Sequence, residues 1–391
     1  MVKTHLIKYF FLLIMIFIYI YDCPIKYSLK EKILLKGRKY LNKCLKGKLN
    51  RKIVTKFVNP KVTVIIPVYN CQNSIKQVIR SIQNQKMINI EIILVNDKGN
   101  DDSIQIIQNI QKIDRRIILI DNKKNMGILY SRCVGALQAK GKYIFPLDND
   151  DMFFDDDVLN IVYEEAYNFN YDIVGFKAIR AHNYKARINE MKDEYFMHSQ
   201  NLTIYKPNLS LFGISKKGKY KKVEAYIWNK CIKNSIYKKA VNSLGRKRYS
   251  IFMNWGEDSS MVFILFNMAE SFRYIIKYGI FKYYGKNNAS IKMSNTHKLF
   301  GKLFLLDIIF DFSKNDFKNK KYAVYKAIGI RNSPFFKYLN KINIKYLKLI
   351  LRKLLSCPYI NNKDKIILTI TFVLKYFFYI ILFWITISNK F

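Results

Sequence analysis

Apolar and polar positions alternate along residues 61–180 in a pattern typical of strands followed by helices. Continuous apolar, often β-branched runs predict buried strands over residues 62–68, 90–96, 116–121, 142–147 and 171–179. Apolar positions at helical spacing predict helices over residues 74–85, 103–112 and 128–139, and another helix that the acidic run 155–157 starts. Such alternation with short connections implies an α/β fold with a mostly parallel central sheet covered on both faces.

Both ends of the chain are apolar. Residues 6–21 would rise about 24 Å as a helix, short of a hydrocarbon core of about 30 Å. We therefore expect residues 1–24 to be a signal anchor, with a cleaved signal peptide as the alternative. Residues 366–388 would reach about 34 Å and predict a transmembrane helix, with a buried or interfacial helix as the alternative. The expectation is a membrane protein of the endoplasmic reticulum or Golgi, whose orientation stays open.

The chain is strongly basic, with 68 Lys and Arg against 28 Asp and Glu and a formal net charge of +40. The excess is mostly lysine, spread along the whole sequence. No RNP aromatics, Cys/His finger spacing or Gly-rich KH loop accompanies it, so we expect no nucleic-acid partner. The 6 cysteines form no C-x-x-C pair, which argues against a zinc ribbon or a thioredoxin-like redox site.

Polar side chains follow three of the predicted strands. Tyr69 follows the first strand, Asp97 the second, and Asp148 and Asp150 the fourth. Ligands of open parallel sheets bind beyond the carboxyl ends of the strands, so these side chains are expected around one crevice. Two neighbouring carboxylates repel each other unless a cation neutralises them, and hard divalent ions prefer oxygen ligands. The D-x-D pair therefore predicts a Mn²⁺ or Mg²⁺ site, with capping of the next helix as the alternative.

The order and spacing of these segments resemble family 2 glycosyltransferases. The stretches VTVIIPVYN, EIILVND, KKNMGILYSR and AKGKYIFPLDNDDMF are similar to the nucleotide-sugar-binding half of that family, and WNKCIKNSIY and NWGEDSSMVF are similar to its acceptor-side segments. The resemblance extends over residues 61–290. It implies a GT-A fold whose partners are a nucleotide-sugar donor and a glycan or glycolipid acceptor.

The resemblance also implies roles for single residues. Donor contacts fall on Pro67, Tyr69, Asp97, Arg132 and Asp148. Among these, Pro67 and Tyr69 line the base pocket, and Asp97 accepts from the base N–H. Asp150, with Asp148 beside it, is the expected ligand of Mn²⁺ or Mg²⁺ that bridges the diphosphate.

On the acceptor side, the resemblance makes Asp258 the general base that takes the acceptor hydroxyl's proton, with capping of a helix as its alternative role. Glu257 and Trp228 are expected to support the site. The implied activity is a metal-dependent, inverting transfer of a sugar, with a UDP-sugar favoured as donor. Lys98 is unexpected in the turn after Asp97, and an Asn stands where relatives often carry a His near residue 288. These departures support the alternative of an inactive relative that binds nucleotide sugars or acts as a scaffold.

The resemblance and the flanking composition divide the chain into six parts. We expect an anchor or signal peptide over residues 1–24, a basic stem over 25–60, a nucleotide-sugar-binding half over 61–180, an acceptor-side half over 181–295, basic amphipathic helices over 296–360 and a transmembrane helix over 366–388. The irregular stretch from 181 to 226 is expected to set acceptor specificity.

Overall fold

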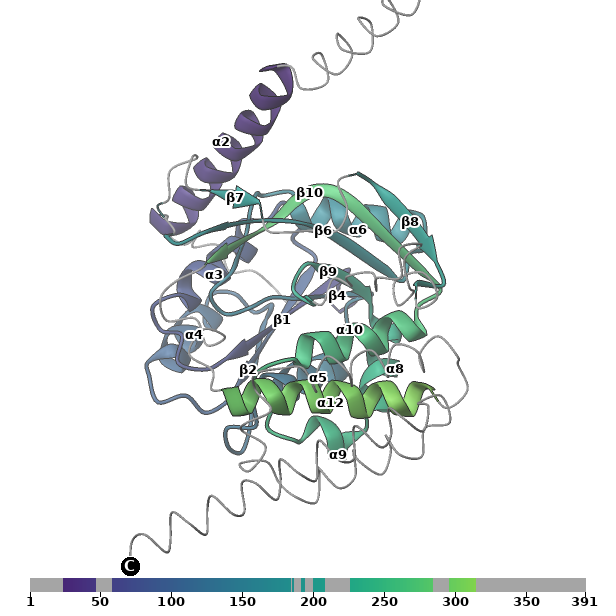
Figure 1. Ribbon diagram of the computed structural model, residues 1–391. Coiled ribbons are helices and arrows are strands. Elements are labelled where there is room, and N and C mark those ends of the chain that lie inside the picture. Colours follow the sequence, from purple (N-terminus) through teal and green to yellow (C-terminus); the bar gives the residue numbers. More distant parts are fainter. Residues whose placement is uncertain are drawn as a thin grey trace, which may run out of the picture.

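The computed structural model describes residues 24–46, 58–183, 185, 191–193, 200–207, 226–283 and 295–313. Within these ranges, ten strands form a single sheet with helices packed against it (Figure 1). The strands are β1 (Val62–Val68), β2 (Ile90–Asn96), β3 (Ile117–Asp121), β4 (Tyr143–Pro146), β5 (Met152–Phe153), β6 (Ile173–Ala181), β7 (Lys192–Asp193), β8 (Leu202–Tyr205), β9 (Lys230–Lys233) and β10 (Ser271–Tyr283). The helices are α2 (Pro24–Lys46), α3 (Ile75–Gln83), α4 (Ser103–Gln111), α5 (Ile128–Gln138), α6 (Val158–Asn168), α8 (Asn234–Leu244), α9 (Arg246–Tyr249), α10 (Glu257–Met268) and α12 (Asn295–Ser313).

The sheet is mixed, which corrects the expectation of a mostly parallel one. Its order is β3-β2-β1-β4-β9-β6-β10-β5, with β7 paired to β6 and β8 paired to β10. The strands β1 to β4 are parallel to one another, as is the pair β6 and β10. β9 lies antiparallel between β4 and β6, and β5 and β8 run antiparallel to β10. Parallel neighbours need crossover connections, and the second half of the sequence lacks the regular strand–helix alternation that supplies them.

The predicted strands and helices of the first half are confirmed, with shifts of one or two residues at their ends. The strands β1 and β2 have the predicted bounds. The helix α6 begins at Val158, directly after the acidic run, although Asp157 makes no side-chain capping bond. Asp155 is buried, with its carboxylate paired to Lys277 of β10. The same carboxylate accepts a hydrogen bond from the backbone N–H of Asp157 (2.9 Å), so it contacts both the lysine and the turn that leads into the helix.

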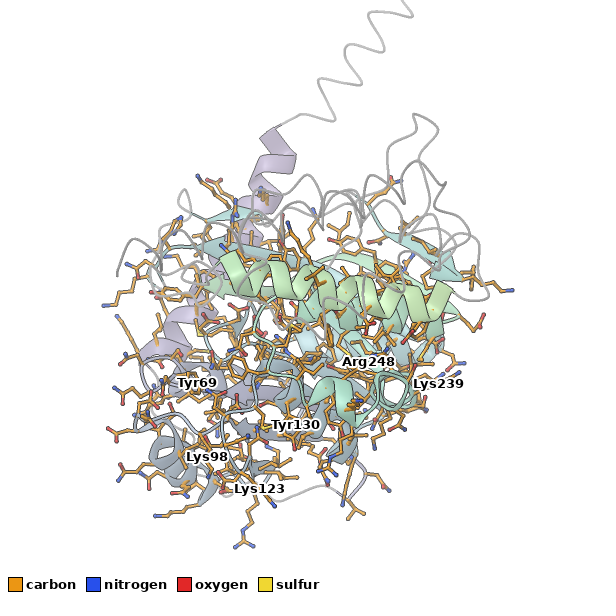
Figure 2. All side chains as sticks on the ribbon, turned by 60° about the horizontal axis from the view of Figure 1, so that its bottom comes forward. Tyr69, Lys98, Lys123, Tyr130, Lys239 and Arg248 are labelled. Carbon is orange, nitrogen blue, oxygen red and sulfur yellow. The ribbon has the colours of Figure 1, made fainter. Side chains whose placement is uncertain are left out.

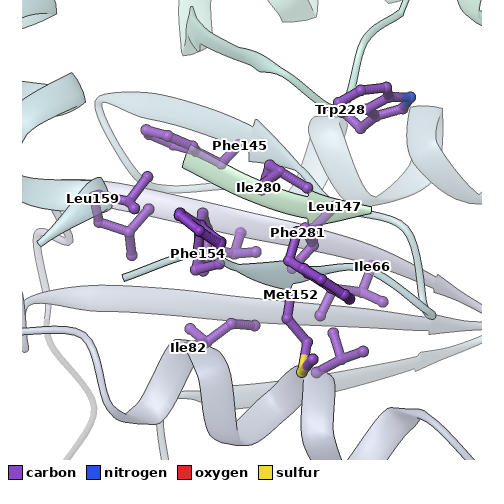
Figure 3. Close-up of a cluster of buried hydrophobic side chains, with 14 of the residues drawn as sticks. Ile66, Ile82, Phe145, Leu147, Met152, Phe154, Leu159, Trp228, Ile280 and Phe281 are labelled. Atoms are coloured by element: carbon purple, nitrogen blue, oxygen red, sulfur yellow. The ribbon is translucent and has the colours of Figure 1, made fainter. Parts of the chain in front are cut away.

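Successive residues of the central strands enter two different cores, because side chains alternate across a sheet. Ile65 of β1 packs in one core with α5, α8, α10 and α12. Val64 and Ile66 pack in the other with α2, α3, α4 and α6. Part of the second core is shown in Figure 3, where Met152 of β5 and Phe281 of β10 lie close to Ile66. The two cores thus cover the two faces of the sheet.

The helix α2 packs on this second core, in the region expected to be a basic stem. Leu41 and Cys44 are fully buried. The hydroxyl of Tyr40 donates a hydrogen bond to the carbonyl of Ser81 at the end of α3 (2.5 Å). Gly37 lies directly against the ring of Phe154, at a spot where a Cβ would come within 2.1 Å of the ring. At least this part of the region is thus bound to the domain.

The expected location in the membrane of the endoplasmic reticulum or Golgi is corrected. Among the residues that the structure describes, no helix is both long and apolar enough to cross a bilayer. The two segments on which the expectation depended, residues 6–21 and 366–388, lie outside the described residues.

Candidate active site

The carboxyl ends of β1, β2 and β4 meet at one edge of the sheet, because these strands are parallel neighbours. Residues 148–151, here called the acidic loop, follow β4 at this edge. The hydroxyl of Ser74 donates to the carbonyl of Asn149 (2.8 Å), and the Asn149 amide donates to the carbonyl of Tyr69 (3.5 Å). The acidic loop is therefore attached to the segment that follows β1, as the strand-end argument predicts.

Three carboxylates of the acidic loop converge. One oxygen each from Asp148, Asp150 and Asp151 lies within 4.8 Å of the others. Burial, together with Asp148 and against the effect of Lys282, raises the pKa of Asp150 to about 6. Burial also raises the pKa of Asp151 well above its usual value. Against the effect of burial, Lys282 and Arg132 instead lower the pKa of Asp148. Three closely spaced carboxylate oxygens are ligands that a hard divalent cation prefers, and the cation would relieve their mutual repulsion, so this donor set fits Mn²⁺ or Mg²⁺.

A lysine from β10 lies against the acidic loop. The Nζ of Lys282 donates to Oδ2 of Asp151 (2.9 Å) and to Oδ2 of Asp148 (3.4 Å). The same ammonium group lies 4.5 Å from the ring centroid of Trp228, which is buried. Trp228, expected from the sequence to support the site, thus contacts it through Lys282.

Arg132 joins the acidic loop to the start of α10. Its Nη2 donates to Oδ1 of Asp148 (2.5 Å), while Nη1 donates to Glu257 (3.3 Å) and to Asp258. The Arg132 side chain is only 3% exposed. One buried guanidinium therefore holds carboxylates from both predicted halves of the protein, and it does so from the helix α5.

Glu257 and Asp258 begin α10 after Gly256, whose φ of 80° places it in the left-handed region that favours glycine. Burial and the neighbouring Asp258 raise the pKa of Glu257 to about 8, against the effect of Arg132. Burial raises the pKa of Asp258 as well. At neutral pH Glu257 therefore holds a proton, and Asp258, whose carboxylate accepts a hydrogen bond from Arg132, is the candidate proton acceptor of the pair.

Asp97 is buried and binds the segment that leads into α5. Its Oδ1 accepts hydrogen bonds from the amide of Asn122 (2.8 Å) and the backbone N–H of Met126 (2.7 Å). Its Oδ2 accepts from the backbone N–H of Gly127 (2.8 Å). Both oxygens are thus engaged within the protein, and they position the N-terminus of the helix that carries Arg132.

The remaining donor-side residues differ in exposure. Pro67 is buried in β1, opposite Val95 of β2. Tyr69 is 44% exposed at the end of β1 (Figure 2). Lys98, unexpected in its turn, has a φ of 57° and pairs with Asp121 at the surface (3.5 Å; Figure 2). Tyr69 is therefore available to a ligand, whereas Lys98 points to β3.

Two residues of the site were not selected from the sequence. Asp151 belongs to the same acidic loop, and its position directly before the apolar β5 is the signal that marks it as buried. The sequence does not single out Lys282, because the chain contains many lysines. Its position next to the acidic loop follows from the pairing of β10 with β5.

The sheet and the position of the acidic loop define a GT-A type of fold. Staphylococcus aureus TarS, solved for residues 1–349 in complex with UDP-GlcNAc, superposes with a TM-score of 0.54 at 14% identity, over 76% of this chain and 80% of that one. Residues 63–239 match the sequence model of glycosyl transferase family 2. This part of the chain is therefore similar to that family, as the sequence motifs predict.

Curated relatives agree with this assignment. An uncharacterised glycosyltransferase of Rickettsia bellii is 39% identical over 120 residues, which are 30% of this chain and 17% of that protein. Glycosyltransferase GlyA of Streptococcus pneumoniae is 28% identical over 203 residues, which are 50% of this chain and 28% of that protein. The chain thus spans well under half the length of these relatives.

Proposed function

We propose that the protein is a metal-dependent, inverting glycosyltransferase that moves a sugar from a UDP-sugar to a hydroxyl acceptor on a glycan or glycolipid. The observation that carries the proposal is Arg132, which brings the acidic loop and the Glu257–Asp258 pair to one site. The complex of TarS with UDP-GlcNAc supports UDP as the nucleotide. The glycan or glycolipid rests on the family resemblance.

In this proposal Asp148, Asp150 and Asp151 are the residues that would hold the divalent cation, which when bound would supply neutralisation of the negative charge on the leaving diphosphate. The exposed ring of Tyr69 stacks on the base of the donor. The carboxylate of Asp97 already accepts hydrogen bonds from Asn122, Met126 and Gly127. A contact with the base would use its remaining lone pairs, so the main contribution of Asp97 in this proposal is to position α5.

Asp258 serves as the general base in this mechanism. Its carboxylate accepts the proton of the acceptor hydroxyl while the oxygen attacks the anomeric carbon and the bond to the diphosphate breaks. Glu257 keeps its own proton at neutral pH, so it does not compete for this one. Arg132 fixes the orientation of Asp258 relative to the acidic loop. A direct displacement of this kind inverts the anomeric configuration.

The test is a panel of UDP-sugars with purified full-length protein, with and without Mn²⁺. Asp150→Ala should abolish metal-dependent binding of UDP, while Asp258→Asn should keep UDP binding and lose turnover by about 10²–10⁴-fold. Asp102→Ala, at an exposed carboxylate outside the site, is the control and should behave as wild type. NMR of the product anomer checks inversion. Normal turnover in Asp258→Asn would remove the assignment of the base.

A further inference from the structure

A lysine ammonium group lies where the acidic loop would bind a cation. The Nζ of Lys282 is 2.9 Å from Oδ2 of Asp151 and 3.4 Å from Oδ2 of Asp148. Asp148 and Asp151 are two of the three residues whose oxygens lie within 4.8 Å of one another. The Lys282 side chain is 14% exposed and that of Asp151 is fully buried. The ammonium group therefore neutralises the carboxylates that a divalent cation would use.

The position of Lys282 is fixed by its neighbours on both sides. Phe281 lies opposite Met152 in the antiparallel pair of β10 and β5, and β5 directly follows the acidic loop. The backbone N–H of Tyr283 donates to Oδ1 of Asp151 (3.1 Å). On its other side the ammonium faces the Trp228 ring at 4.5 Å, which is within the range of a cation–π contact. Lys282 is thus part of a built site and not a mobile surface lysine.

The charges of the site leave a place for one further cation. Three carboxylates face a single lysine, and the guanidinium of Arg132 is shared among Asp148, Glu257 and Asp258. The acidic loop therefore holds more acidic groups than Lys282 alone can neutralise. Because an ammonium group and a divalent ion repel each other at such distances, the arrival of the ion weakens the hold of the carboxylates on Lys282.

We propose that Lys282 is an internal counter-ion that competes with the divalent cation for the acidic loop and, once displaced, binds the diphosphate of the donor. The inference rests on the proposed function, because it takes the same loop to be the site of cation and donor. A lysine suits both positions, since its ammonium is a compact charge on a flexible four-carbon stem and binds phosphate oxygens. Because Lys282 reaches the diphosphate only after the cation has displaced it, the cation binds before the donor.

The first experiment measures Mn²⁺ binding to the full chain without donor, by electron paramagnetic resonance of the free ion. Removal of the competing charge in Lys282→Met should tighten Mn²⁺ binding by about tenfold. Lys277→Met is the matched control, because Lys277 lies on the same strand and pairs with Asp155 outside the acidic loop. It should leave Mn²⁺ affinity unchanged. Unchanged or weaker Mn²⁺ binding in folded Lys282→Met overturns the proposal.

A second experiment needs no variant. Reductive methylation of wild-type protein, read by mass spectrometry, reports how accessible the Lys282 amine is. Methylation of Lys282 should increase when Mg²⁺ is added and decrease again when UDP is added with Mg²⁺, while that of Lys277 should not respond. Methylation of Lys282 that is the same with and without Mg²⁺ contradicts the displacement.

The inference and the proposed function fail in different ways. If neither wild type nor Lys282→Met binds Mn²⁺, the metal-dependent function fails, and the role of Lys282 fails with it. If wild type binds Mn²⁺ and Asp150→Ala does not, while Lys282→Met has wild-type affinity, only the role of Lys282 fails. Weaker UDP binding by Lys282→Met at saturating Mn²⁺, by about tenfold, supports its contact with the diphosphate.

Discussion

Arg132 and Asp148, sixteen positions apart in the chain, are joined by a hydrogen bond of 2.5 Å between Nη2 and Oδ1. The arginine comes from α5 and the aspartate from the acidic loop after β4. Because the same guanidinium also binds Glu257 and Asp258, the relative position of the donor-side and acceptor-side carboxylates depends on one buried cation. Each of the predictions below changes a group in this arrangement or a group that supports it.

Arg132→Met should lower the free energy of unfolding by about 3–5 kcal/mol, because it leaves carboxylates buried without their partner. Asp148→Asn should then cost less in the Arg132→Met background than in wild type, by more than about 0.5 kcal/mol. Urea unfolding of the four proteins measures this coupling. As a control, Arg116→Met removes another buried arginine, which pairs with Asp114 (2.8 Å) and shares no partner with Arg132. Its effect should add to that of Arg132→Met, and additivity between Arg132 and Asp148 would contradict the role assigned to their contact.

Asp97→Asn should destabilise the protein by about 1–3 kcal/mol, because its amide group replaces an acceptor of backbone N–H groups with a donor. It should also reduce turnover, since the bonds to Met126 and Gly127 place the start of α5 and thus Arg132. Thermal and urea unfolding measure the first effect. Asp102→Asn, at an exposed position, should change stability by less than about 0.5 kcal/mol. A fully stable Asp97→Asn protein with weakened UDP binding would instead favour a direct contact with the base.

The stability of the wild type should fall as pH rises from about 5 to about 8. Burial and Asp258 raise the pKa of Glu257 to about 8 from an ordinary value of 4.5. Between these values the folded protein holds a proton that the unfolded chain has lost, so the stabilisation is present at low pH and is lost as pH approaches 8. One such group contributes a slope of at most about 1.4 kcal/mol per pH unit.

Glu257→Gln should remove this part of the pH dependence, because the amide has no proton to lose. Urea unfolding of both proteins at several pH values gives the difference, in which the titration of the other shared groups largely cancels. Asp258 and Arg132, the charged groups that face Glu257, are kept in both. Equal slopes for wild type and Glu257→Gln would mean that Glu257 is ionised in the folded protein.

Tyr69→Ala should weaken UDP binding by about tenfold at saturating Mn²⁺, because stacking of a base on an aromatic ring contributes about 1–3 kcal/mol. Tyr69 is 44% exposed, so the change should leave the free energy of unfolding nearly unchanged. Tyr205→Ala, at a tyrosine on β8 that is 71% exposed, is the matched control and should bind UDP as wild type does. Isothermal titration with UDP measures both. Wild-type affinity in Tyr69→Ala would place the base elsewhere.

The sequence predicted those features of the site that depend on local pattern. Apolar runs gave the strands β1 and β2 within their true bounds, and the strand-end rule then placed Tyr69, Asp97 and Asp148 at one edge. Contacts between distant segments were not predictable in this way. The bonds of Asp97 to residues 122–127, the position of Lys282 and the burial of Asp155 each depend on tertiary pairing. The hydrophobic periodicity of the sequence does not indicate such pairing, because it does not distinguish a charged residue that is solvated from one that is buried.

The strand β10 has a consequence for how such a protein can change its specificity. It is hydrogen-bonded to β5 and β6 from the first half and to β8 from the second, and it carries Lys282 to the acidic loop. A recombinant that exchanged everything after residue 181 for the corresponding part of a relative would replace the three ladders of β10, the ladders of β7 and β9, and one charge of the cation site in a single step. New acceptors are therefore reached more readily by substitutions and insertions between the strands than by shuffling of halves.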